Sequence, residues 1–238
     1  MKVKSFVHSC HFTPNRYTPR TLPMKPITGL FSLVFAASLA AAPKGQLTYE
    51  TPAAAAKNPD FTIQGEYIGE GMDGEGKQTK LGLQIVALGE GTFQATAFGG
   101  GLPGAGWDGD TKWVYSGKRK GEDKASFAND QSPIAFHYLK GKVIAAKGDQ
   151  KVGSFEKVTR KSPTLGAKAP KGAKVLFGGK DNGTLDQLKI TDDGLMKEGA
   201  ITKDKFQSFK LHVEFRLPFK PTARGQARGT SGLYLQRR

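Results

Sequence analysis

Residues 81–98 read LGLQIVALGEGTFQATAF. Two runs rich in β-branched and aromatic residues flank residues 89–91, and this pattern is typical of a β-hairpin because glycine accepts the positive φ of a tight turn. The sequence after this hairpin also consists of runs of β-formers separated by turns, with further turn signals at 140–141 and 148–149. No window carries a helical period over enough residues. The sequence therefore predicts an antiparallel meander or small barrel over residues 60–160.

The other strands expected in this region can be placed from the same signals. They are DFTIQGEYIGEG at 60–71, TKWVYSGKRK at 111–120, a pair within 134–148, and GSFEKVTRK at 153–161. Each is short, rich in β-formers and bounded by glycine or charged turn residues. The whole chain is therefore expected to be mainly β.

A glycine-rich loop, GGGLPGAGWDGD at residues 99–110, interrupts these strands. Its glycines formally match G-x-G-x-x-G, the pattern of a dinucleotide-binding turn. Pro103 lies inside the match, however, and no amphipathic helix follows to direct its N-terminus at a phosphate. The loop is therefore interpreted as a connection, in which Trp107 either stacks on a ligand or anchors the loop to its own domain.

Composition and charge narrow the class of protein. The 238 residues include 31 glycines and 13 prolines, which indicates many turns. The net charge is +15, of which the acid-free residues 1–43 contribute five positive charges. The remaining excess is spread as single lysines, a pattern typical of a solvated surface rather than of a phosphate-binding groove. Nucleic acid is therefore not an expected partner.

The N-terminal region has the features of a secretory signal. Residues 24–45 read MKPITGLFSLVFAASLAAAPKG, with a positive start at Lys25 and an apolar core too short to span a bilayer. Ala40 and Ala42 supply the small residues of a cleavage site. The alternative, a buried helix, fits poorly with the proline- and alanine-rich stretch that follows.

The signal sequence affects what the mature chain is expected to contain. Residues 1–42 are expected to be removed, so the protein would be periplasmic or extracellular with no stable membrane anchor. Translation starts at Met1 or at Met24, and the well-formed signal favours Met24. The only cysteine, Cys10, would leave with the leader, so no disulfide constrains the mature protein.

Changes in composition divide the chain into five parts. Two proline-containing stretches, PKGQLTYETPAAAAKNP and KSPTLGAKAPKGA, resemble linkers. The predicted order is leader and signal at 1–42, linker at 43–59, small β domain at 60–160, linker at 161–173, and a further domain at 174–238.

The last part resembles the start of the 3-keto-disaccharide hydrolase family, also called domain of unknown function 1080. Four motifs occur in the family's order, namely LFGGKD (176–181), DDGLMKEGAITKDKFQSF (192–209), FKLHVEFRLPF (209–219) and RGQARGTSGLYLQ (224–236). The sequence departs from the family at Gly178, where aspartate is usual, and at Thr230, where asparagine is usual. It also lacks the tryptophan expected soon after Gly178.

The resemblance implies a concanavalin A-like jelly-roll sandwich, of which residues 174–238 would form only the first strands. The expected fold is a small antiparallel β domain followed by this incomplete sandwich. Because a sandwich needs two opposed sheets over one core, a truncated domain of this kind is expected to have impaired activity. The segment SGLYLQ is expected to be an inner strand.

Alternation in KLHVEFRL, residues 210–217, supplies candidate site residues. In a regular strand Leu211, Val213, Phe215 and Leu217 would face the core, and the opposite polar face would be either solvated or directed at a sugar. Glu214 is the candidate catalytic acid or base on that polar face. The candidate substrate-binding residues are His212, Arg216, Arg224, Arg228, Tyr234 and Gln236.

The resemblance implies an exported, bacterial, glycan-active enzyme that cleaves 3-keto-glycosides. The alternative is a non-catalytic protein that binds carbohydrate or cell wall, because the same architecture binds sugars without chemistry. A carbohydrate substrate or glycan is the expected partner in both cases. No metal motif occurs, and the cofactor is unknown, since the sequence has no H-x-H, H-E-x-x-H or cysteine cluster.

Overall fold

The computed structural model describes residues 5–8, 47–72, 76–229 and 232–235. It is mainly β, as the sequence predicts. The chain divides into two compact units. The barrel unit comprises residues 46–165 and 217–238, and the second unit comprises residues 1–45 and 166–216.

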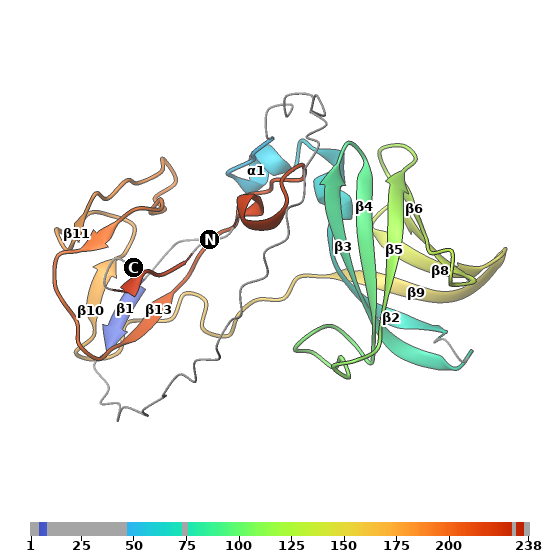
Figure 1. The fold of residues 1–238 in the computed structure, drawn as a ribbon, viewed down its shortest axis with the longest axis horizontal. Helices are drawn as coiled ribbons and strands as arrows, with labels where there is room; N and C mark the ends of the chain where they lie inside the picture. Colours follow the sequence, from blue (N-terminus) through green and yellow to red (C-terminus); the bar gives the residue numbers. More distant parts are fainter. Residues whose placement is uncertain (1–4, 9–46, 73–75, 230–231, 236–238) are drawn as a thin grey trace, which may run out of the picture. The chain divides into compact units, whose positions relative to one another are not determined.

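The barrel unit is organised round a closed antiparallel barrel of eight strands. The strands follow one another in sequence order, and the last pairs with the first (Figure 1). They are β2 Gly65–Met72, β3 Gln78–Gly89, β4 Thr92–Gly99, β5 Lys112–Arg119, β6 Lys124–Ala128, β7 Ile134–Leu139, β8 Lys142–Lys147 and β9 Gln150–Val158. The sequence left an antiparallel meander and a small barrel as alternatives for this region, and the structure is a barrel.

Tight turns set the register of the hairpins. Between β3 and β4, Glu90 and Gly91 have φ values of 53° and 71°. Between β7 and β8, Lys140 and Gly141 have φ values of 47° and 92°. Positive φ at both central residues matches the right-handed twist of the flanking strands, which is why such turns connect neighbouring antiparallel strands.

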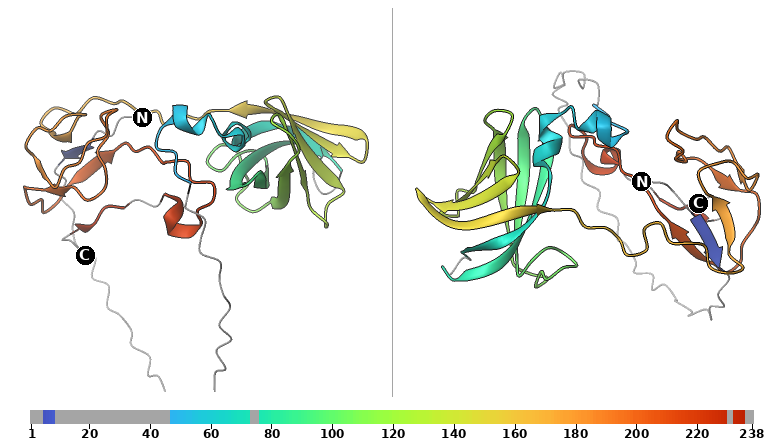
Figure 2. Two further views of the ribbon diagram at one scale, coloured as in Figure 1. Left: turned by 90° about the horizontal axis from the view of Figure 1, so that it is seen from above. Right: turned by 180° about the vertical axis from the view of Figure 1, so that it is seen from behind.

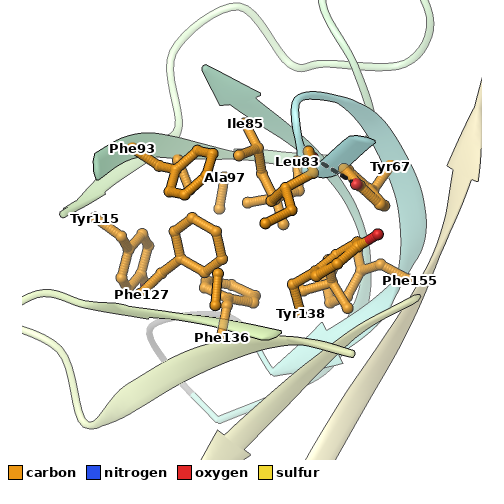
Figure 3. Packing of buried hydrophobic residues seen from close by; sticks show 14 of the residues in the cluster. Tyr67, Leu83, Ile85, Phe93, Ala97, Tyr115, Phe127, Phe136, Tyr138 and Phe155 are labelled. Carbon is orange, nitrogen blue, oxygen red and sulfur yellow. Dashed lines mark hydrogen bonds between the residues drawn. The ribbon is translucent and has the colours of Figure 1, made fainter. Parts of the chain in front are cut away.

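Side chains fill the interior of the barrel (Figure 3). Alternate residues of each strand point inward, and several of them are aromatic rings in edge-to-face contact. Ring centroids lie 4.8 Å apart for Tyr115 and Phe136, and 5.6 Å apart for Phe136 and Phe155. Gly117 leaves room for Phe127, because a Cβ atom there would lie 2.3 Å from the Phe127 ring. The middle of the barrel is therefore a packed core.

Two short helices, α1 Pro52–Ala55 and α2 Pro59–Ile63, precede the first barrel strand. Each starts with proline after a capping residue, and the Thr51 hydroxyl and Asn58 amide oxygen accept hydrogen bonds from backbone N–H groups of the first turn. The sequence was interpreted differently here, as a linker followed by a strand from residue 60. The caps explain the helices, although both are too short to show helical periodicity.

Asp60 connects α2 to the barrel. Its side chain is buried, 2% exposed. One carboxylate oxygen accepts a hydrogen bond from Arg119 Nε at 2.9 Å, and the other accepts one from the backbone N–H of Gly91 at 3.0 Å. The bonds tie α2 to the β3–β4 turn and to the end of β5. They hold the helix at the end of the barrel where β2, β4, β6 and β8 begin.

The segment from residue 217 onward belongs to the barrel unit. Tyr49 and Phe219 exchange two backbone hydrogen bonds of 3.0 Å. The Phe219 ring is buried and packs edge-on against Phe61, with centroids 5.1 Å apart. A 3-10 turn, η1 Gly225–Arg228, follows. Part of the region expected to form the sandwich therefore packs on the barrel.

The second unit contains two small sheets (Figure 2). Strands β10 Lys174–Phe177, β1 Ser5–His8 and β13 Lys210–Val213 form an antiparallel sheet with β1 in the middle. Strands β11 Leu185–Asp186 and β12 Ile201–Thr202 pair separately. β1 lies inside the predicted leader, whose other residues fall almost entirely outside the described ones. The jelly-roll arrangement stays a prediction.

Two local expectations are wrong. β13 ends at Val213, so the alternation expected through Leu217 stops there. Glu214 is only 6% exposed, whereas Phe215 on the expected core face is 53% exposed. The second wrong expectation is the strand in SGLYLQ, because the described residues 232–235 form no strand. A strand persists only where a neighbour accepts its backbone hydrogen bonds, and within the described residues no neighbour pairs with either stretch.

Candidate functional site

Two of the predicted site residues, Glu214 and His212, are in contact with each other. Glu214 follows β13 directly, two positions after His212, so both side chains leave the chain on the same side. His212 Nε2 lies 3.2 Å from Glu214 Oε1. The same oxygen accepts a hydrogen bond from the backbone N–H of Gly166. His212 remains 28% exposed, so it is the more accessible member of the pair.

The geometry indicates how the pair can act chemically. A carboxylate beside an imidazole fixes the orientation of the ring. The side chain of His212 is 28% exposed, so its ring can be reached by a ligand. The buried carboxylate itself is held by the protein, so His212 is better placed than Glu214 to serve as acid or base. The sequence analysis assigned these roles the other way round.

Arg216 is held by a residue that the sequence analysis did not single out. Its Nη1 lies 2.5 Å from Asp193 Oδ2, and the Thr191 hydroxyl donates to Asp193 Oδ1 at 2.6 Å. These bonds, that of Arg216 first, lower the pKa of the Asp193 carboxyl to about 2. The guanidinium of Arg216 is thus neutralised within the second unit, where a sugar would have to share it with Asp193.

Arg224 and Arg228 lie in the barrel unit and bind backbone carbonyl oxygens. Arg224 Nη2 donates to Leu88 O at 2.7 Å, and Arg228 Nη2 donates to Ala87 O at 2.6 Å. Both acceptors lie near the end of β3, so the two arginines fasten the segment that carries η1 to that strand. Burial lowers the pKa of Arg228, with the neighbouring charge of Arg224 adding to the effect. Substrate binding by these residues stays a prediction.

The last two candidates are Tyr234 and Gln236. Tyr234 is 80% exposed. Gln236 lies outside the described residues. The candidate set is therefore divided between the two units, with His212, Glu214 and Arg216 in the second unit and Arg224, Arg228 and Tyr234 in the barrel unit.

A separate hollow lies at one end of the barrel. Its volume is about 90 Å³, and none of the predicted site residues lines it. The lining side chains come from β2, β3, β4, β5, β7, β8 and the loop before β7, including Leu81, Trp113, Tyr115, Ser132, Phe136 and Lys147. No local motif could have indicated this site, because its residues converge only when the barrel closes. Trp107 does not line it: its Nε1 donates to Thr111 O at 3.0 Å, which anchors the glycine-rich loop.

Within residues 5–8, 47–72, 76–229 and 232–235, no three His, Cys, Asp or Glu side chains are grouped so that they could hold a metal ion. None of the helices in this described part is long and apolar enough to cross a membrane.

No family model and no curated protein matches the sequence. Among solved structures, the chain is similar to the one described as "The Siderocalin Ex-FABP functions through dual ligand specificities". The identity is 15% and the TM-score 0.26, over 44% of this chain and 80% of that chain. A likeness of this extent leaves the function to be inferred from this chain's own residues.

Proposed function

We propose that the protein is an exported glycan-active protein whose residues 174–238 act on 3-keto-glycosides in the manner of 3-keto-disaccharide hydrolases. The ordered motifs of the last 65 residues support the substrate class. The observation that carries the chemistry is the contact between His212 Nε2 and the buried Glu214 Oε1, at 3.2 Å. It orients an accessible imidazole, which is the group most often used for proton transfer near neutral pH.

The proposed reaction uses the acidity that a 3-keto group confers on the neighbouring C–H. The imidazole of His212 takes that proton, and the electron pair forms a carbon–carbon double bond as the glycosidic C–O bond breaks. The departing oxygen leaves as an alcohol once it receives a proton. Water then adds across the double bond and restores the 3-keto-sugar. Glu214 holds the imidazole in one orientation between the two proton transfers.

The test measures the reducing sugar that the full chain releases from a 3-keto-disaccharide. We expect His212→Asn and Glu214→Gln each to lower the rate by about a hundredfold or more, the range for a lost acid–base group. Lys210→Gln, an exposed change on the same strand, is the matched control. Unchanged turnover in His212→Asn and Glu214→Gln, with unchanged far-UV circular dichroism, would rule out this pair as the acid–base group.

A second candidate is a non-catalytic carbohydrate- or cell-wall-binding protein. The observation that favours it is that Glu214 is buried and accepts a hydrogen bond from the Gly166 N–H. These contacts suit a carboxylate that holds the fold together rather than one that reacts with a substrate. Saturable glycan binding by the wild-type chain and by His212→Asn, with no sugar released by either, would support this candidate over the hydrolase.

The exported location is proposed from the signal sequence and has its own test. N-terminal sequencing of the protein recovered from outside the cytoplasm should begin after Ala42. A recovered protein that retains Phe31 would contradict cleavage of the signal.

A further inference from the structure

We propose that the hollow at the open end of the barrel binds a small apolar carboxylate, with its ring or short chain among the aromatic side chains and its acid group at Lys147. The site lies wholly in the barrel unit and does not depend on the proposed glycan chemistry.

The two ends of the barrel differ in what covers them. At the end where β2 starts, α2 packs against the strands, Ile63 is fully buried, and the Tyr67 hydroxyl donates to Ile63 O at 2.6 Å. At the opposite end, where β2 finishes and β3 starts, the hollow opens between strands and is lined by side chains such as Leu81 and Trp113. An eight-stranded barrel is just wide enough to hold one small ligand where its side chains do not meet.

The floor of the hollow limits the length of the ligand. Tyr115 and Phe136 line it, and below them Phe127 and Phe155 are fully buried within the packed core (Figure 3). A closed cavity of about 150 Å³ accommodates benzene. A hollow of about 90 Å³ that opens to solvent therefore suits part of a ring, or a few carbons of a chain, with the polar end outside.

The lining favours an apolar acid over a sugar. Ser132 and Lys147 are the polar side chains among the lining residues, apart from the rings of Trp113 and Tyr115. The Ser132 hydroxyl accepts a hydrogen bond from the backbone N–H of Ile134 at 3.1 Å and lies 3.2 Å from the Tyr115 hydroxyl. This hydroxyl therefore already has hydrogen-bonding partners within the protein. A sugar needs several hydrogen-bonding partners, whereas an apolar pocket with one cation at its rim is suited to a single acid group.

Tryptophan fluorescence provides a direct test with the full chain. The sequence has two tryptophans, so Trp107→Phe leaves Trp113, which lines the hollow, as the sole reporter. We expect benzoate and hexanoate to change its emission saturably, and benzyl alcohol and hexanol to bind more weakly. Affinity should stop rising as the acid is lengthened beyond hexanoate, because the aromatic floor blocks further entry.

Three variants distinguish a site from general attraction to a basic protein. Lys147→Gln should lower the affinity for benzoate and hexanoate by at least tenfold and leave the affinity for the alcohols unchanged. Lys142→Gln removes the same charge from the other end of β8 and should leave all four ligands unchanged. Ile134→Phe, at the edge of the hollow, should abolish binding of acids and alcohols alike.

Three results would overturn the proposal. They are no saturable change with any acid, equal weakening by Lys147→Gln and Lys142→Gln, and tighter binding of a disaccharide such as trehalose than of benzoate. If Trp107→Phe does not fold, as judged by thermal unfolding, calorimetric titration of the wild-type chain and the two lysine variants decides the same questions.

Discussion

The exposed Asp193 and the partly buried Arg216 form a pair whose effect can be measured one residue at a time. Because the Arg216 hydrogen bond lowers the pKa of Asp193 to about 2 from an ordinary 3.8, the pair stabilises the fold above pH 3.8 and loses its effect as the pH falls through 2. Arg216→Gln should move the Asp193 pKa back toward 3.8, which carboxyl-carbon NMR titration can follow.

A matched control for this prediction is Arg160→Gln. Arg160 binds Glu66 in the barrel unit through two nitrogens, at 2.6 and 2.5 Å, and has no part in the Asp193 pair. The substitution Arg160→Gln should raise the pKa of Glu66 and leave the pKa of Asp193 near 2. An Asp193 pKa that does not respond to Arg216→Gln would show that the pair is not formed in solution.

Tyr67 makes the barrel sensitive to alkaline pH. Burial raises the pKa of its hydroxyl far above the ordinary value of 10, with the nearby Tyr138 adding to the effect. Below pH 10 the group is neutral in both the folded and unfolded states. Above pH 10 the unfolded state ionises first, so the free energy of unfolding should fall as the pH rises toward the folded-state pKa.

Denaturant unfolding at pH 8, 10 and 11 tests this expectation. Tyr67→Phe should lower the free energy of unfolding at pH 8 by about 1 kcal/mol, because the bond to Ile63 O is lost, and should reduce its fall between pH 10 and 11. Tyr234→Phe, at an exposed residue, is the control and should match the wild type. An equal fall in all three proteins would mean that Tyr67 does not contribute.

At the scale of elements, Asp60 determines whether α2 stays on the barrel. The buried Asp60 carboxylate accepts one hydrogen bond from the partly exposed Arg119 and one from the Gly91 N–H, and losing two hydrogen bonds to a charged group costs about 3 kcal/mol. Asp60→Ala should therefore lower the free energy of unfolding by about that amount. Glu156→Gln breaks an exposed pair with Lys142 and should cost less than about 1 kcal/mol. Similar losses in the two variants would show that Asp60 is not buried in solution.

A second element, the segment from residue 217 to residue 229, shows why a local pattern is an incomplete guide. From the sequence, two of its arginines, Arg224 and Arg228, are candidate substrate-binding residues. In the structure the guanidinium groups of Arg224 and Arg228 donate to carbonyl oxygens of Leu88 and Ala87, which are more than a hundred residues away in sequence. Carbonyl acceptors carry no residue-specific signal, so a sequence does not show them as partners.

At the scale of the whole molecule, the connection between the barrel and the second unit is the expected point of cleavage. Residues 161–173 form no helix or strand, and Lys161, Lys168 and Lys171 are exposed. Every barrel strand is paired on both sides, so its backbone is protected. Limited trypsin digestion should first cut within 161–173 and leave a resistant fragment that contains residues 65–158. Early cleavage at Lys118 or Lys142, identified by mass spectrometry, would contradict this stability order.

The sequence alone predicted those parts of the barrel that depend on residues close together in the chain. The turn at Glu90 and Gly91 and the turn at Lys140 and Gly141 were both recognised, because positive φ is a property of one or two residues and glycine signals it. The mainly β class followed from the same turns and from the β-formers between them. Sheet closure was left open between a meander and a barrel, since pairing of β2 with β9 joins residues about ninety positions apart.

The tertiary structure alone decided which of the candidate residues lie together. Burial of Glu214 against the Gly166 N–H, the pairing of Arg216 with Asp193, and the hollow at Lys147 each bring together residues separated by at least twenty positions. The alternation through Phe215 predicted the wrong face, because burial depends on how long a strand remains paired and not on its pattern alone. Local conformation is encoded within a few residues, whereas a site depends on contacts that form only when distant segments close over a common core.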